Sequence, residues 1–110
     1  MAETYKKLAH ALADATSEDV YTVPASTTTI VKHIRLTNVD TSNSCHVKLY
    51  HRDNGDSSDT TTQILSQATI EAGGWAEFEG TIIMEAQDIL TLVVQTADDI
   101  NFAVYGLELT

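Results

Sequence analysis

The chain has a single cysteine, Cys45, and the residue after it is His46, so these two could in principle supply a nucleophile and its base. Such a pair works only when the two side chains face each other. The segment around them alternates between apolar and polar residues, as a strand does, and adjacent residues on a strand point to opposite faces. Cys45 shares the phase of Val47 and Leu49, so we expect it to be a small core residue. The sequence contains neither a Gly-x-Ser-x-Gly elbow nor a phosphate-binding glycine-rich loop, and we expect no enzymatic activity.

Two sets of side chains could bind a metal ion. Three histidines fall on neighbouring predicted strands, but no His-x-x-x-His or Cys-x-x-Cys spacing supports a zinc site. A polar loop follows residue 52 and contains the oxygen ligands that calcium prefers, namely Asp53, Asn54, Asp56 and Asp59. An EF-hand is not matched, because Gly55 stands at the third place and no Glu closes the loop. We interpret the segment as an exposed acidic loop, with calcium at Asp53, Asp56 and Asp59 as the alternative, and expect no cofactor.

Five basic side chains could form an interaction surface. They lie on two successive predicted strands, on the face opposite the apolar residues: His33, Arg35, His46, Lys48 and Arg52. If the two strands pair as a hairpin, all five share one outer surface, and an acidic partner could neutralise them. If the strands belong to opposite sheets, the strip divides. A merely solvated face is the alternative interpretation.

The segments that must position these residues are strands. From Asp19 onward, short runs rich in β-branched residues alternate with turn signals at roughly ten-residue spacing, which is typical of a sandwich or barrel. We expect about eight strands in one antiparallel β-sandwich, jelly-roll-like, over residues 19–110. Its predicted core consists of Ile34, Leu36, Val47, Leu49, Leu92, Val94 and Phe102.

Three positions in this pattern lead to specific expectations. Ile30 has the same phase as Ile34 and is expected to share its face. Lys32 also has that phase, so it either extends its amine from the core edge or marks a β-bulge. Gly80 is expected to break the strand that begins at Trp75, and Trp75 itself is interpreted as a core or interface residue.

Residues 1–18 form a segment of different character, which we interpret as an N-terminal arm. Tyr5, Leu8 and Leu12 are spaced as on one face of an amphipathic helix. The segment is nevertheless too short to be stable alone in water. We expect it to become ordered against another surface, and both a helix and a strand are compatible with its sequence.

Composition excludes several classes of function. With 110 residues and 43% apolar content, the chain is long enough for one domain with a core of its own. The net charge of −10 disfavours a nucleic-acid partner. The sequence has no apolar run long enough to span a membrane and no apolar core of a signal peptide. Residues 53–110 contain eleven acidic residues and no Lys, Arg or His, whereas residues 1–52 sum to +1. This division reflects either a solvated surface or charge complementarity with another molecule.

Several motifs resemble a family of small structural proteins in tailed bacteriophage virions. They are Tyr5-Lys6-Lys7-Leu8, Val20-Tyr21-Thr22-Val23-Pro24-Ala25, the strand from Ile30 to Asn38, Ala72-Gly73-Gly74, Leu90-Thr91-Leu92-Val93-Val94 and Phe102-Ala103-Val104-Tyr105-Gly106. In such proteins a glycine usually follows the Val-Pro-Ala turn, whereas this chain has Ser26. The resemblance implies a β-sandwich of the virion and no catalytic residues.

The function implied by this resemblance is capsid decoration, also called cementing, in which the protein binds the outer capsid surface and stabilises the shell. The implied partners are the major capsid protein and further copies of the chain, with a trimer favoured over a dimer and no membrane or nucleic acid. The implied location is the virion, assembled in the host cytoplasm. The expected interaction residues are the basic strip together with Tyr5, Leu8 and Leu12. The alternatives are a tail or head-tail accessory component, or a carbohydrate- or receptor-binding module of a tail fibre.

Overall fold

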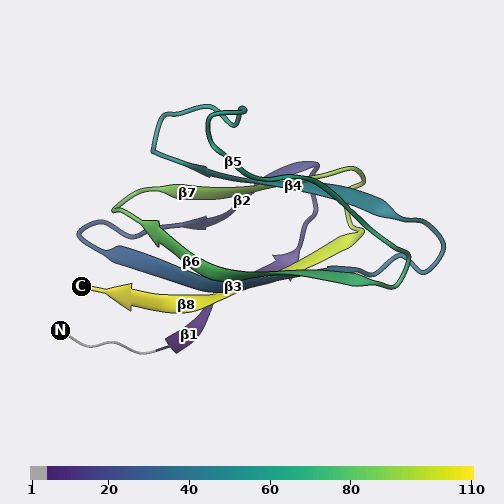
Figure 1. Cartoon of the computed structure of the whole chain (residues 1–110), viewed down its shortest axis with the longest axis horizontal. Helices are drawn as coiled ribbons and strands as arrows, with labels where there is room; N and C mark the ends of the chain where they lie inside the picture. Colours follow the sequence, from purple (N-terminus) through teal and green to yellow (C-terminus); the bar gives the residue numbers. More distant parts are fainter. Residues whose placement is uncertain (1–4) are drawn as a thin grey trace.

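The structure of the protein is a computed structural model that describes residues 5–110. These residues form eight strands: β1 (Tyr5–Leu12), β2 (Ser17–Thr22), β3 (Thr28–Asn38), β4 (Cys45–Arg52), β5 (Gln63–Ile70), β6 (Trp75–Met84), β7 (Ile89–Val94) and β8 (Ile100–Leu109). The strands lie in two antiparallel layers that face each other (Figure 1). We call them sheet A, with the order β1-β8-β3-β6, and sheet B, with the order β2-β7-β4-β5.

The strand pairing is that of a jelly roll. The first strand pairs with the last, the second with the seventh, the third with the sixth, and the fourth with the fifth. Such nested antiparallel pairs arise when one long hairpin is folded over itself into two sheets. The all-β, jelly-roll-like sandwich expected from the sequence is therefore confirmed.

The core lies between the two sheets and contains the residues that the alternating pattern predicted. Ile34, Leu36, Val47, Leu49, Leu92, Val94 and Phe102 are each at most 4% exposed. Cys45 is a fully buried free cysteine in the same layer, as expected from its phase. Cys45 and His46 point to opposite sides of sheet B, because their residue positions alternate along β4.

A β-bulge at Lys32 changes the phase of β3. The register of β3 shifts between Val31 and His33: Lys32 is an extra residue against β8, whereas Gly80 and Thr81 of β6 both lie opposite it on the other side. The core residue on the N-terminal side of the bulge is consequently Val31, and the expectation that Ile30 shares the face of Ile34 is wrong. Gly80 lies opposite this bulge and does not end β6, which continues to Met84.

The N-terminal segment is a strand where the structure describes it. β1 pairs with β8 at the edge of sheet A, so of the two conformations considered the strand is present and the helix is not. The expected boundary between residues 18 and 19 falls inside β2. Only Leu8 and Ala9 of β1 are half-buried and pack against the core. Whether residues 1–18 are separable from the domain stays a prediction, and residues 1–4 lie outside the described part.

The turn between β2 and β3 places a serine in an unusual backbone conformation. Ser26 has a φ of 59°, in the left-handed region that glycine enters without steric cost. This is the position at which the resembling phage proteins usually have glycine. Serine therefore adopts this backbone conformation here, and Thr27 and Thr29 are buried directly after the turn.

Candidate interaction surface

The basic strip predicted from the sequence is divided between the two sheets. His33 and Arg35 belong to β3 in sheet A, whereas His46, Lys48 and Arg52 belong to β4 in sheet B. β3 and β4 do not pair with each other, so the hairpin alternative is wrong. The connection between β3 and β4 crosses from sheet A to sheet B, and the two groups consequently lie on opposite outer faces.

On the outer face of sheet A, the basic residues have partners within the chain. The guanidinium of Arg35 donates to Glu77 Oε1 at 3.1 Å and lies 4.5 Å from the centre of the Trp75 ring. His33 Nε2 lies 3.2 Å from Glu77 Oε2, close enough for an ion pair but misaligned for a hydrogen bond. The His33 ring also stacks on Tyr105 at a centroid distance of 5.6 Å. This cluster is held by ion pairing and aromatic stacking on three strands.

On the outer face of sheet B, the side chain of Arg52 is held by hydrogen bonds and an ion pair, whereas those of His46 and Lys48 form no ion pair within the described residues. Arg52 donates to Asp19 at 3.0 Å, to the Thr91 hydroxyl at 3.1 Å and to the Asp56 carbonyl at 2.8 Å. Within residues 5–110, the side chains of His46 and Lys48 make no ion pair. Lys48 therefore offers a positive charge that forms no ion pair within the described chain, and His46 lies beside it on the same face.

The large exposed apolar side chains gather on one face. Among residues 5–110, six such side chains are exposed: Tyr5, Leu12, Val39, Trp75, Ile83 and Tyr105. Five of the six lie on the outer face of sheet A, because the register places them opposite residues that point away from the core. Only Val39 lies in a loop. Outer sheet faces are usually polar, so this concentration indicates a docking surface.

Sequence reasoning identified only part of this surface. Tyr5 and Leu12 were expected to contribute, and both lie on it at 70% and 41% exposure. Leu8 does not, because it is the extra residue of a bulge in β1 and is half-buried against the core. Ile83 was missed and is 61% exposed; it continues the outward positions of Trp75, Glu77 and Glu79 on β6 and pairs with Ile30.

Two aromatic residues, Trp75 and Tyr50, differ in exposure from what the sequence suggested. Trp75 is 57% exposed and covers Arg35, so the core interpretation of this residue is wrong. Tyr50, an outward residue of β4 by its phase, is buried at 8% exposure. Of the three aromatic residues considered for ligand binding, Trp75 and Tyr105 are therefore the accessible ones.

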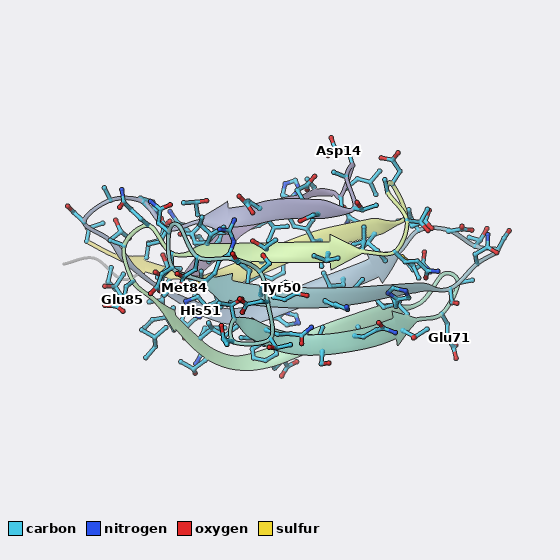
Figure 2. All side chains as sticks on the ribbon, turned by 90° about the horizontal axis from the view of Figure 1, so that it is seen from above. Asp14, Tyr50, His51, Glu71, Met84 and Glu85 are labelled. Carbon is cyan, nitrogen blue, oxygen red and sulfur yellow. The ribbon has the colours of Figure 1, made fainter. Side chains whose placement is uncertain are left out.

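The acidic loop between β4 and β5 has an internal hydrogen-bond network. Asp59 accepts hydrogen bonds from the backbone and hydroxyl groups of Thr61, which lower the pKa of its carboxyl group. Asp53 behaves in the opposite way, because the nearby carboxyl group of Asp88 raises its pKa. Asp88 is buried and also binds His51 at 2.9 Å, at the end of the sandwich where Figure 2 shows His51 and Glu85.

The candidate metal ligands Asp53, Asp56 and Asp59 do not converge in the structure. Within residues 5–110, the one group of potential ligands that meets in space is His33, Glu77 and Glu79, whose ligand atoms lie within 4.8 Å of one another. Arg35 already neutralises Glu77 there. This group belongs to the charged cluster of sheet A.

A narrow apolar cleft opens between the sheets at the β5 and β6 edges. Its volume is about 140 Å³, and half-buried residues including Leu65, Ala68 and Phe78 line it together with core residues. The two edge strands β5 and β6 belong to different sheets and do not pair, so the sandwich stays open on this side. No helix of the described residues is long and apolar enough to cross a membrane.

Comparison with known proteins extends the fold assignment. No protein-family model and no curated protein match the chain. Among solved structures, a chain from the acid-stable capsid of Helicobacter pylori bacteriophage KHP30 superposes with a TM-score of 0.54. It is 12% identical, and the match covers 100% of this chain and 94% of that chain. A chain from Bacillus endospore appendages, described as disulfide-linked pili, has a TM-score of 0.56 and 20% identity.

The match to the appendage chain covers 98% of this protein and 88% of that chain. Both structures therefore correspond to the whole sandwich rather than to one sheet of it. At these identities the likeness concerns the fold alone. It shows that this eight-strand arrangement, at nearly the same length, occurs in a capsid and in a surface appendage.

Proposed function

We propose that this chain is a structural subunit of a virion and acts in capsid decoration, without enzymatic activity. The observation that carries the proposal is the outer face of sheet A, where five of the six large exposed apolar side chains gather. A soluble domain rarely keeps such a face uncovered, because exposed apolar area favours association. The proposed partners are the major capsid protein and further copies of the chain.

Two further observations support this proposal. The fold occurs at full length in a phage capsid, and the described residues place no catalytic pair in contact, since Cys45 is buried and points away from His46. The net charge of −10 makes protein a better partner than nucleic acid. The proposed location is the virion, reached after folding in the host cytoplasm.

We assign the contact with the shell to the outer face of sheet B. His46 and Lys48 form no ion pair within the described chain and lie on neighbouring outward positions of β4. A patch of this sign fits an acidic surface, and such contacts govern association rate and register more than they govern affinity. The apolar outer face of sheet A then remains available for contacts between copies of the chain.

The test compares phage particles that contain this protein with particles from which its gene has been deleted, and measures the resistance of their shells. Particles that lack the protein should have an intact shell that breaks at lower temperature or lower salt, and added protein should restore resistance. Lys48→Glu should weaken binding to these particles, whereas the same change at Lys32, on the bulge of the other sheet, should not. Particles with unchanged resistance, or equal binding by both variants, would contradict the decoration function.

A second function is favoured by the exposure of Trp75. Carbohydrate sites commonly use an exposed aromatic ring, and Trp75 is 57% exposed beside Tyr105 and Arg35 on one sheet. A receptor-binding module of a tail fibre would leave the shell resistant in the deletion particles but prevent their adsorption to cells. Trp75→Ala should then reproduce the adsorption defect. A tail or head-tail accessory component would instead appear at the vertex that bears the tail in electron micrographs.

A further inference from the structure

The outer face of sheet A is ordered into four rows that cross its strands. Each row takes one outward residue from β1, β8, β3 and β6, in this order. The first row is Tyr5, Leu107, Ile30 and Ile83, and the second is Lys7, Tyr105, His33 and Glu79. The third row is His10, Ala103, Arg35 and Glu77, and the fourth is Leu12, Asn101, Thr37 and Trp75. Apolar residues thus fill the first row and end the fourth.

The two middle rows have opposite charges at their two ends. Lys7 and His10 lie on the β1 edge and are exposed, whereas Glu79 and Glu77 lie on the β6 edge. Arg35, in the centre, is already paired with Glu77. The face therefore has a basic edge and an acidic edge, separated by the width of four strands.

We propose that two copies of the chain pack through this face about a two-fold axis that runs parallel to the strands. Such a rotation places β1 over β6 of the partner subunit and keeps each row opposite the same row. Lys7 then faces Glu79 of the partner subunit, and His10 faces Glu77 of the partner subunit. Tyr5 meets Ile83 of the partner subunit, and Leu12 meets Trp75 of the partner subunit. Because the contact is isologous, each of these pairs occurs twice.

The other two-fold axis in the plane of the interface is disfavoured by the same charges. A rotation about an axis perpendicular to the strands would place β1 over β1 of the partner subunit and reverse the rows. Lys7 would then face His10 of the partner subunit, and Glu79 would face Glu77 of the partner subunit. Like charges at close range destabilise an interface, so the arrangement of the rows selects the strand-parallel axis.

The size of the face suits a modest but specific interface. Four strands at about 4.8 Å spacing and eight residues at about 3.3 Å rise give roughly 500 Å² per copy, or about 1,000 Å² in total. That lies at the lower limit of stable protein–protein interfaces, near about 1,000–1,200 Å². Aligned packing of twisted sheets at about 30° is also the ordinary geometry of two facing sheets.

This inference deepens the proposed function, on which it rests for its biological context, because it names the self-association surface of the subunit. It leaves the shell contact on sheet B, at the opposite outer face. A trimer would require a different contact, because a strand-parallel two-fold axis closes the assembly at two copies.

The mass of the purified full chain in solution tests the interface. Sedimentation equilibrium between about 1 µM and 1 mM should show a monomer–dimer equilibrium of the 12.0 kDa chain. Ile83→Lys, at a 61% exposed position, should leave the fold unchanged and weaken dimerisation by about 100-fold or more. Val39→Lys makes the same change at a 49% exposed residue outside the face and should have no effect. A wild-type monomer at every concentration would overturn the inference, as would a dimer that tolerates Ile83→Lys.

Exchange of the edge charges tests the axis. Lys7→Glu and Glu79→Lys should each weaken dimerisation by about tenfold at low salt, because each change makes two facing pairs repulsive. The two variants mixed should form a heterodimer, because one contact then pairs Glu at position 7 with Lys at position 79 and the other keeps the original pair of Lys7 and Glu79. About the perpendicular axis, Lys7→Glu would face His10 of the partner subunit and strengthen dimerisation. That result, or the absence of a heterodimer, would overturn the proposed geometry.

The particle experiment and the dimer experiment test the proposed function and the proposed interface separately. If Lys48→Glu abolishes particle binding while the wild-type chain stays monomeric, the proposed function holds and this interface does not. If the dimer and its charge exchange are observed but deletion particles keep their resistance, the interface holds and decoration is contradicted.

Discussion

Glu108, near the end of the described chain, connects three strands through its carboxylate. Lys6 of β1 forms an ion pair with it, and the hydroxyl of Tyr21 on β2 donates to its other oxygen. These hydrogen bonds lower the pKa of Glu108, with that from Lys6 the largest cause. Burial, reinforced by Glu108, raises the pKa of the Tyr21 hydroxyl, so this group stays protonated as a donor. The cluster joins both sheets at the end of the sandwich where β8 ends (Figure 1).

Glu108→Gln should therefore destabilise the protein at pH 7 by about 1–2 kcal/mol. Since the folded pKa lies below the ordinary value of 4.5, the stabilisation is complete above pH 4.5. It is lost as the pH falls through the folded pKa, where the folded state also takes up the proton. Urea unfolding of both proteins at pH 7 and pH 3 measures this, and the difference should be smaller at pH 3 than at pH 7.

Glu71→Gln is the matched control, because Glu71 is exposed in the turn between β5 and β6. It should change stability little at either pH. An equal loss at pH 7 and pH 3 for Glu108→Gln would mean that packing, rather than the charge of Glu108, holds the cluster together.

Gly106 is required by the close approach of β3 to β8. A Cβ atom on Gly106 would lie 2.1 Å from the carbonyl oxygen of Ile30, which is backbone and cannot rotate away. The bulge at Lys32 brings this part of β3 towards β8, and glycine in a strand often marks such an approach.

Gly106→Ala should consequently destabilise the fold by about 2–3 kcal/mol, since the two strands must separate. Gly73→Ala is a useful comparison, because Gly73 has a φ of 69° but open space around its Cβ position. It should cost only about 1 kcal/mol of backbone strain. Thermal unfolding compares the stability of the two variants. A smaller loss of stability for Gly106→Ala than for Gly73→Ala would show that the strands adjust at little cost.

At the level of elements, β1 is the strand least embedded in the fold. It is the edge of sheet A, pairs with β8 alone, and buries no side chain fully. Ala13, directly after it, is by contrast completely buried and donates its N–H to the Ile100 carbonyl. A natural boundary for truncation therefore lies after Leu12 rather than after residue 18, which is inside β2.

Removal of residues 1–12 should leave seven paired strands that still fold, with lower stability because Lys6 no longer pairs with Glu108. Self-association should be lost, since Tyr5, Lys7 and Leu12 supply one edge of the proposed interface. Circular dichroism and sedimentation measure the two effects separately. A truncated chain that does not fold would make β1 an essential strand, and one that still dimerises would exclude β1 from the interface.

The bulges explain which element-level expectations were correct. Alternation predicted the core positions of β3 after Lys32, namely Ile34 and Leu36, because no irregularity interrupts the strand there. Before Lys32 the phase of β3 is reversed, and Ile30 consequently lies on the outer face, where it pairs with Ile83 of β6. Alternation between apolar and polar residues does not reveal where an extra residue is inserted. The only signal of this bulge in the sequence was Lys32, a lysine at an apparent core position.

For the molecule as a whole, the jelly roll mixes the two oppositely charged halves of the sequence. In each sheet the strands alternate between residues 1–52 and residues 53–110. Of the five ion pairs in the described part of the chain, four join the two halves, and Arg52–Asp19 is the exception. The fold thus compensates part of the charge division, because these ion pairs use three of the eleven acidic residues of the second half, namely Glu77, Asp88 and Glu108.

The nested pairing also predicts the order of folding. β4 and β5 close a short loop, whereas β1 and β8 must close a loop of nearly the whole chain, which costs more entropy. Leu49→Ala, in β4, should therefore slow folding, and Leu8→Ala, in β1, should mainly accelerate unfolding. Stopped-flow chevron plots of both variants measure these rates. A slower folding limb for Leu8→Ala alone would reverse the proposed order.

The sequence by itself determined the class of the fold, the core of most strands and the buried role of Cys45. These follow from local alternation and turn residues, which each strand carries independently of its neighbours. Tertiary structure alone decided which strands share a sheet, and with that the division of the basic strip, the exposure of Trp75 and the gathering of apolar residues on sheet A. Pairing joins residues up to a hundred positions apart, and local pattern contains no information about partners at that distance.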